Sequence, residues 1–189
     1  MEHELHPEQG YITRVADRLG IEVKLVQHEE PTNTCDEKLD LLKQDQDHKY
    51  CEWTIERIVK ALYFTSNGSP FIGFITQELR ERLKPGKVFP KILSMPRDRA
   101  DNYYVDAGKT PEGMKLGTCT PFPWESSVGR EIENIIVRDF PSLNDRLVDI
   151  SIGGVNKESQ MISMHLPYSG IYEILKKQFG EKVHLYSKS

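Results

Sequence analysis

A lysine in an apolar stretch is the first candidate for chemistry. Lys60 lies within the apolar run 57–64. If this run is a β-strand, alternation places the ammonium on the same face as Ile58 and Leu62. A charge on such a face is costly unless an anion, a cluster of carbonyl groups or an open cleft receives it. The pattern therefore makes Lys60 a candidate substrate contact, with an edge-strand lysine that blocks aggregation as the alternative.

The loop 116–123 is a second candidate because Gly117 and Pro121 bracket three small residues. Such a turn exposes backbone N–H groups, and N–H groups that converge on one point can stabilise a developing oxyanion. Glycine and proline also mark ordinary turns, so the spacing alone does not define a site. The candidate substrate contacts in this loop are Thr118, Cys119, Thr120 and Pro121.

Two predicted strand ends carry further candidates. Asp139 follows the predicted strand 132–138 and could act as a general base, or as a capping or turn acid before Phe140. Ser151 lies near the end of the predicted strand 147–152, which stops at Gly153 and Gly154. Because glycine has no side chain, this pair would let the backbone approach a ligand closely.

Two other chemistries remain open on the residues alone. Cys119 beside an amide-rich turn could attack an ester, with His165 as its base. A zinc site is the other alternative, because one histidine and one cysteine have a ligand-like spacing. Its candidate ligands are His28, Cys35, His48 and Cys51.

Composition limits the class of protein. The chain has 189 residues, of which 38% are hydrophobic and 29% charged, so we expect one globular domain. No apolar run approaches the roughly 20 residues that span a bilayer, and the N-terminus lacks the pattern of a signal peptide. We therefore expect a cytoplasmic protein. Three widely spaced cysteines do not indicate a disulfide framework.

The net charge of −4 is unevenly distributed. The segment 80–99 holds seven basic and two acidic residues, a local charge of +5 that leaves −9 for the remainder. A basic patch on an acidic body suits contact with part of an RNA, because each phosphate contact is local. A solvated helix and loop is the alternative. The candidate RNA contacts are Lys84, Lys87 and Lys91.

Periodicity predicts a mixed α/β chain. It predicts helices over 10–19, 77–83 and 169–179, and strands over 21–26, 58–64, 71–75, 88–93, 132–138, 147–152 and 161–166. We expect the runs 58–64 and 71–75 to form one hairpin, and the last two strands to form another. The polar stretch 34–49 is expected to be a helix or an insert that packs lightly.

The order of these parts resembles the YbaK and prolyl-tRNA synthetase editing-domain family of aminoacyl-tRNA deacylases. The likeness runs from about Lys60 to about Leu175 and is weakest between Cys35 and Trp53. The family pattern has a lysine on an apolar strand, a Gly-x-x-x-Pro loop and a strand end like Ser-x-Gly-Gly. In this sequence these parts fall on Lys60, on Gly117 and Pro121, and on Ser151, Gly153 and Gly154.

The resemblance implies a single domain over residues 1–189, with a central mixed, partly barrel-like β-sheet flanked by helices. It implies hydrolysis in trans of the ester that joins an amino acid to tRNA, without metal or cofactor. The partners would be the aminoacylated 3′ end of tRNA and an aminoacyl-tRNA synthetase. Lys60 would hold the tRNA terminus and the loop 117–121 the aminoacyl carbonyl, so Lys60 and Gly117 are the catalytic candidates.

The sequence also departs from the family pattern. Many relatives carry two adjacent glycines before the proline loop, whereas Leu116 precedes Gly117 in this chain. This difference leaves the edited amino acid open. The family gives no role to the stretch 35–53, which could cap the substrate cleft. The resemblance assigns water activation to the substrate itself, and the alternative function is a non-catalytic tRNA-binding relative.

Overall fold

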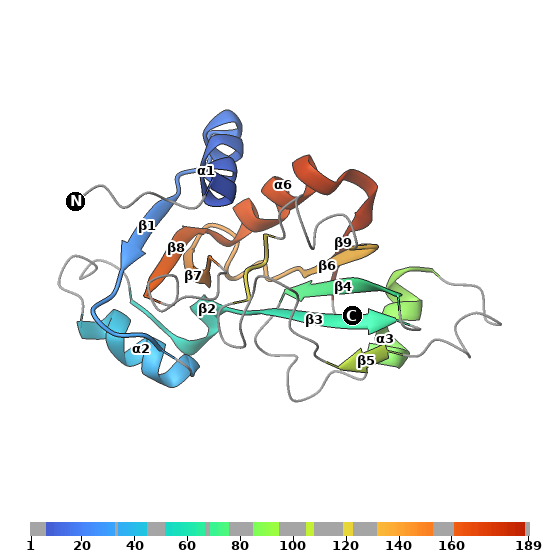
Figure 1. The fold of residues 1–189 in the computed structure, drawn as a ribbon, viewed down its shortest axis with the longest axis horizontal. Helices are drawn as coiled ribbons and strands as arrows, with labels where there is room; N and C mark the ends of the chain where they lie inside the picture. Colours follow the sequence, from blue (N-terminus) through green and yellow to red (C-terminus); the bar gives the residue numbers. More distant parts are fainter. Residues whose placement is uncertain are drawn as a thin grey trace.

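The described strands form two sheets, and helices lie against them (Figure 1). This computed structural model describes residues 7–32, 34–44, 52–66, 69–75, 85–94, 105–107, 119–122, 132–152 and 161–187. Both sheets contain parallel and antiparallel neighbours, so the predicted mixed α/β class is confirmed. The described strands form two open sheets and do not close into a barrel.

The four-stranded sheet has the order β1-β8-β7-β2. Its strands are β1 (Lys24–Gln27), β8 (Ile162–Pro167), β7 (Leu147–Ser151) and β2 (Ile58–Val59). Strands β7 and β8 pair antiparallel, as predicted for a hairpin. Strand β2 pairs parallel with β7 and forms an edge.

The five-stranded sheet has the order β5-β3-β4-β6-β9. Its strands are β5 (Val105–Ala107), β3 (Ala61–Ser66), β4 (Ser69–Ile75), β6 (Asn134–Arg138) and β9 (Val183–Tyr186). The predicted hairpin is confirmed by the antiparallel β3–β4 pairing. Because β2 and β3 are separated only by Lys60, the chain leaves the edge of one sheet there and enters the interior of the other.

Four helices accompany the described strands: α1 (Pro7–Leu19), α2 (Cys35–Gln44), α3 (Pro85–Ile92) and α6 (Tyr168–Phe179). Helix α1 ends at Gly20, whose φ of 70° is the left-handed conformation that glycine adopts readily. At this end of the helix, the Gly20 N–H donates to the Asp17 carbonyl and the Ile21 N–H donates to the Ala16 carbonyl. None of the described helices is both long enough and apolar enough to cross a membrane.

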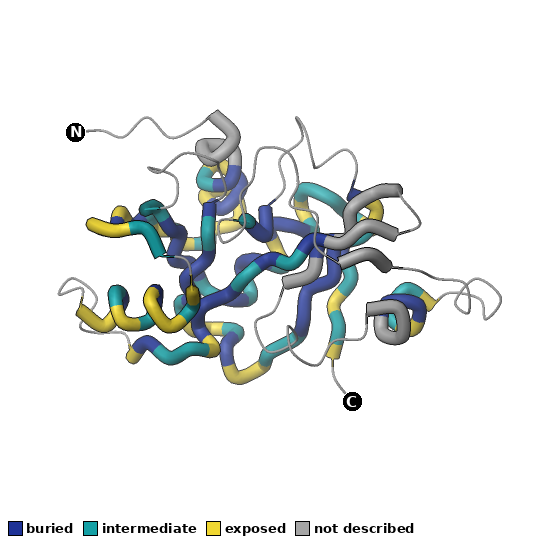
Figure 2. Tube along the Cα trace, turned by 60° about the horizontal axis from the view of Figure 1, so that its bottom comes forward, coloured by how far each residue is buried: buried dark blue, intermediate teal, exposed yellow. Residues whose placement is uncertain are grey.

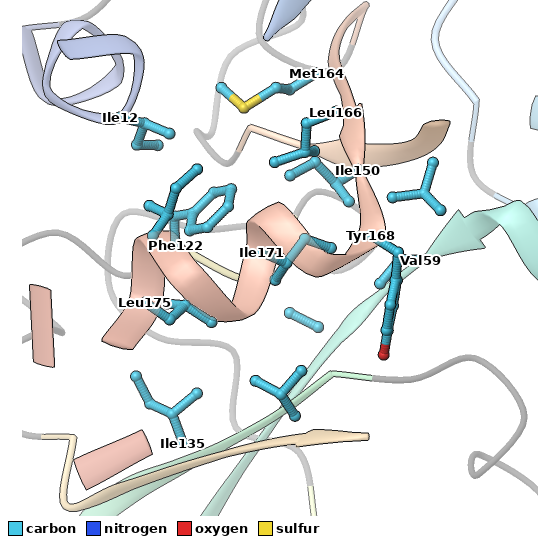
Figure 3. Close-up of a cluster of buried hydrophobic side chains, with 14 of the residues drawn as sticks. Ile12, Val59, Phe122, Ile135, Ile150, Met164, Leu166, Tyr168, Ile171 and Leu175 are labelled. Atoms are coloured by element: carbon cyan, nitrogen blue, oxygen red, sulfur yellow. The ribbon is translucent and has the colours of Figure 1, made fainter. Parts of the chain in front are cut away.

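Helix α6 supplies much of the main core. Its residues Ile171 and Leu175 are fully buried and lie among side chains from both sheets (Figure 3). Ile150 comes from the four-stranded sheet and Ile135 from the five-stranded sheet. Buried stretches run through β6, β7, β8 and α6, whereas α2 is mainly exposed or intermediate (Figure 2). The predicted terminal helix and its inward stripe are therefore confirmed.

One prediction about an element is wrong. The run 88–93 was expected to be a strand, but it lies largely in α3, which begins at Pro85. Proline suits the first helical position, where its missing N–H needs no partner, and Phe89 and Ile92 then lie three residues apart on one helical face. The stretch 34–49 was expected to be a helix or an insert that packs lightly; the helix is confirmed over Cys35–Gln44, and its Leu42 is 1% exposed. The predicted helix 77–83 lies outside the described residues.

The central position of α6 predicts a large effect of truncation there. We expect Ile171→Ala to lower the free energy of unfolding by about 3 kcal/mol, because it removes buried methyl groups and leaves a cavity. Leu185→Ala is the matched control: Leu185 is 49% exposed in β9, and its truncation should cost within about 0.5 kcal/mol. Urea unfolding measures both. Equal losses would contradict the assignment of α6 to the core.

Candidate active site

Strands β7 and β8 each present one apolar and one polar side. Val148 and Ile150 of β7, and Met164 and Leu166 of β8, point into the main core. The alternate residues point to the opposite side of the sheet. We call this side the polar face and define it by Asp149, Ser151, Ser163 and His165. Asp149, Ser163 and His165 are each 1% exposed, so these polar groups are buried.

A carboxylate and an imidazole pair directly across the polar face. Asp149 and His165 are register partners in the β7–β8 ladder. The distance between His165 Nε2 and Asp149 Oδ2 is 3.0 Å. Because an ionised carboxylate can only accept, His165 Nε2–H is the donor in this contact.

A serine and a second histidine extend the network. Ser163 hydrogen-bonds the Asp149 carboxylate, and His28 Nε2 lies 2.7 Å from Ser163 Oγ. The serine hydroxyl must donate its proton to the carboxylate, so its oxygen accepts from His28 Nε2–H. His28 is therefore a donor to Ser163 and not its base. This direction of hydrogen bonding argues against Ser163 as a nucleophile.

Opposing effects set the pKa of Asp149. Burial by itself would raise the pKa of this carboxyl group, because desolvation penalises the charge. The hydrogen bond from His165, the Lys38 ammonium and the hydrogen bond from Ser163 lower the pKa, and together they outweigh burial. The net result is a lowered pKa, which means that the fold stabilises the charged carboxylate.

Helix α2 and the described residues 52–58 cover this region. Leu42 of α2 packs in a cluster with Trp53 and Ile58, and Ile58 is the β2 register partner of Asp149. The Trp53 ring lies 4.8 Å from the His165 ring, measured between centroids. Arg57 stacks on Trp53 at 4.7 Å and donates from Nε to the Leu147 carbonyl. The described parts of the stretch 35–53, to which the family resemblance gives no role, therefore belong to this cover.

Lys60 lies where the chain changes sheets. Val59 and Ala61 on either side are buried in the main core, and Lys60 itself is half-buried. Alternation therefore places the Lys60 side chain away from that core, on the side of Ile58. This agrees with the predicted face. The neighbouring strand β2 is an edge strand, so the edge-strand alternative also retains a structural basis.

A second lysine lies close to the same region. Lys38 of α2 is 7% exposed. Burial is the main cause that lowers its pKa, the Lys60 ammonium lowers it further, and Asp149 acts in the opposite direction. Lys38 is therefore within electrostatic range of both Lys60 and Asp149.

The second half of the predicted oxyanion loop is fixed from β3. The Tyr63 hydroxyl donates to the Thr120 carbonyl at 2.6 Å, and the Phe122 N–H donates to Thr120 Oγ1 at 3.1 Å. Thr120 and Pro121 are buried. The Thr120 side chain thus serves the turn, and a ligand would meet it only if the turn opened. Tyr63 follows Lys60 by three residues, or about 10 Å along an extended chain.

Cys119 does not have the environment of a catalytic thiol. Burial raises its pKa to about 11, which disfavours the reactive thiolate. Cys119 packs against the main core, whereas His165 belongs to the polar face on the other side of the four-stranded sheet. The structure therefore argues against a nucleophile and base pair made of Cys119 and His165.

Asp139 lies apart from the polar face. Its backbone N–H donates to the Tyr186 carbonyl, and its carboxylate accepts from Ser187 Oγ at 3.1 Å. These contacts tie the end of β6 to the C-terminal segment, which fits the interpretation of Asp139 as a turn acid. Ser151 is half-buried and is the register partner of Ser163.

The other predicted site residues can be placed only in part. Gly117, Thr118, Gly153, Gly154 and Lys84 lie outside the described residues, as do His48 and Cys51 of the zinc hypothesis. Lys87 falls within α3, and Lys91 is exposed at its end. In the described ranges, no group of three or more histidine, cysteine or acidic residues could hold a metal ion.

Sequence reasoning missed most of the polar face. It did not select Lys38, Trp53, Asp149 or Ser163, and it considered His28 and His165 only for other chemistry. A signal was present: Asp149 lies between Val148 and Ile150, and Ser163 and His165 alternate with apolar residues in β8. Polar residues at every second position of apolar strands indicate a buried polar face.

Comparisons with known proteins support the fold alone. No family model and no curated protein matches the chain. Among solved structures, the crystal structure of a hypothetical protein, APE2540, is similar with a TM-score of 0.57 and 17% sequence identity. The match covers 91% of this chain and 95% of that chain. The chain therefore shares a mixed α/β fold with that protein, and the family resemblance remains a prediction.

The lowered pKa of Asp149 predicts a stability loss in acid. A carboxyl group with a folded pKa below its unfolded value of about 4 contributes stability above pH 4, and this contribution disappears as the pH falls through the folded pKa. We expect Asp149→Asn to be less stable at pH 7 by about 1–3 kcal/mol and to lose less on acidification. Urea unfolding from pH 7 to pH 3 measures this.

Asp145→Asn, at an exposed carboxyl group, is the matched control and should keep the acid loss of the unmodified protein. If Asp149→Asn loses as much stability in acid as the unmodified protein does, the Asp149 carboxylate is not the group responsible.

Proposed function

We propose that this protein is an aminoacyl-tRNA deacylase that hydrolyses mischarged tRNA in trans, as the resemblance to the YbaK and prolyl-tRNA synthetase editing-domain family implies. The proposed substrate is the ester at the 3′ end of tRNA, and the proposed place of action is the cytoplasm. An aminoacyl-tRNA synthetase that makes the mischarged product is the proposed second partner. No metal or cofactor enters the proposed reaction.

One observation supports this proposal above the others. Lys60 directly precedes β3, and β3 carries Tyr63, whose hydroxyl donates a hydrogen bond to the Thr120 carbonyl. Tyr63 lies three residues after Lys60, and Thr120 lies three residues after Gly117. This hydrogen bond therefore joins the neighbourhoods of two family signals that are 57 residues apart in the sequence. A rigid link of this kind suits a site that must hold two ends of one substrate.

The proposed chemistry needs few protein groups, because an aminoacyl ester is already activated. Backbone N–H groups of the loop 117–121 would stabilise the oxyanion as the carbonyl carbon is attacked. Lys60 would hold the tRNA terminus and so fix the ester relative to the loop. Water would be activated by the substrate's own polar group, which leaves Asp139 without a catalytic role.

The alternative is a non-catalytic tRNA-binding relative of the editing domain. The buried Thr120 side chain and the hydrogen-bonded turn at 120–122 favour this alternative, because the Thr120 hydroxyl is already used within the turn and does not face a substrate. Stabilisation of an oxyanion by backbone N–H groups does not require a free Thr120 side chain, however, so the deacylase remains the preferred function.

Deacylation of a panel of mischarged tRNAs tests the proposal. We expect hydrolysis of at least one ester, and a loss of about 10- to 100-fold in kcat/KM in Lys60→Ala, because that variant loses a charge-assisted contact. Lys177→Ala, at an exposed lysine of α6, is the matched control and should retain full activity. Absence of hydrolysis across the panel would sink the deacylase and leave the binding relative.

The basic segment gives a separate prediction about binding. If Lys84, Lys87 and Lys91 contact phosphates, changing all three to alanine should reduce the slope of log K against log salt by about three units. Filter binding of uncharged tRNA over a range of salt concentrations measures the slope. An unchanged slope, with the Lys177→Ala control also unchanged, would show that this segment is only a solvated surface.

A further inference from the structure

Lys38 is a buried cation for which the described residues supply no direct anion. The residue is 7% exposed, in a helix whose other residues are mainly exposed or intermediate. Within the described part of the chain, no hydrogen bond or ion pair to its ammonium is found. An ammonium placed in such a position is costly unless an anion joins it.

The helix directs Lys38 toward the strand junction. Leu42 follows Lys38 by four residues, so the two side chains share one face of α2. Leu42 packs against Ile58, and Lys60 lies two residues beyond Ile58 on the same side of the chain. Two lysines, one from α2 and one from the sheet junction, therefore approach the same region.

Among the described residues, the carboxylate that acts on Lys38 is that of Asp149, and it is already engaged. Asp149 accepts hydrogen bonds from His165 and Ser163, and it carries a single negative charge against two ammonium groups. Lys60 and burial both lower the pKa of Lys38, while Asp149 only partly compensates. Among these three described groups, positive charge therefore exceeds negative charge.

We propose that Lys38 and Lys60 together form a site for a phosphate group, with Lys38 as a second substrate-binding lysine supplied by α2. Two ammonium groups on separate elements suit a phosphate, whose oxygens accept several charge-assisted hydrogen bonds at once. The identity of the molecule that carries the phosphate rests on the proposed function: it would be the terminal phosphodiester of tRNA. The site gives α2 a role in binding as well as in covering the polar face.

Binding of AMP and of adenosine, measured by calorimetry, tests the site. The two probes differ only in the phosphate, so a site for phosphate should bind AMP about tenfold more tightly. Lys38→Met keeps the length and apolar stem of the side chain but removes its charge. We expect this variant to bind the two probes about equally and to unfold at or above the temperature of the unmodified protein.

Lys43→Met, at an exposed lysine of the same helix, is the matched control and should keep the preference for AMP. If Lys38→Met fails to fold, the phosphate site is tested by the unmodified protein and by Lys60→Met. The unmodified protein should prefer AMP to adenosine, and Lys60→Met should lose that preference. Equal affinity of the unmodified protein for AMP and adenosine, no binding of either, or an unchanged preference in Lys38→Met would overturn the proposal.

The two proposals can fail separately. A preference for AMP without hydrolysis of any mischarged tRNA would retain the phosphate site and remove the deacylase. Hydrolysis of a mischarged tRNA without a preference for AMP over adenosine would support the deacylase and overturn the proposal that Lys38 binds a phosphate.

Discussion

The buried carboxylate of Asp149 is the interaction on which one side of the four-stranded sheet depends. An isolated charge at this depth would cost several kcal/mol. His165 and Ser163 offset that cost from the adjacent strand, and they can do so only in the register that pairs Asp149 with His165. The same register directs the alternate residues of both strands into the main core. A shift by one residue would turn the apolar side chains out of the core and the polar side chains into it.

The change of sheets at Lys60 is the second constraint. Ile58 and Val59 belong to the edge of one sheet, and Ala61 begins an interior strand of the other. Lys60 itself belongs to neither strand, and its side chain turns away from the core toward the side that α2 covers. Helix α2 brings Lys38 to this region, so the charge of the site and its cover come from the same element. The proposed site and the change of sheets therefore coincide at this point of the chain.

Much of the fold could be predicted from the sequence, because the strands at 132–138, 147–152 and 161–166 and the last helix carry clear periodicities. The run 88–93 forms a helix and not the expected strand, because its short apolar pattern fits either period, and α3 even contains Pro90, a residue that disfavours a helix interior. The face of Lys60 was predicted correctly, since alternation is a local property. The polar face could not be assembled in the same way: it depends on which strands become neighbours and on α2 packing over them, and both are tertiary properties.

The central claim is that Lys60, Lys38 and the loop 117–121 act on one substrate. A crystal structure with AMP that carries an aminoacyl group at its 3′ position, joined through an amide in place of the ester, tests this most directly. The phosphate should lie within about 4 Å of both ammonium groups, and the amide carbonyl should face the N–H groups of the loop. An analogue bound elsewhere, for example along α3, or with its phosphate away from Lys38 and Lys60, would contradict the claim.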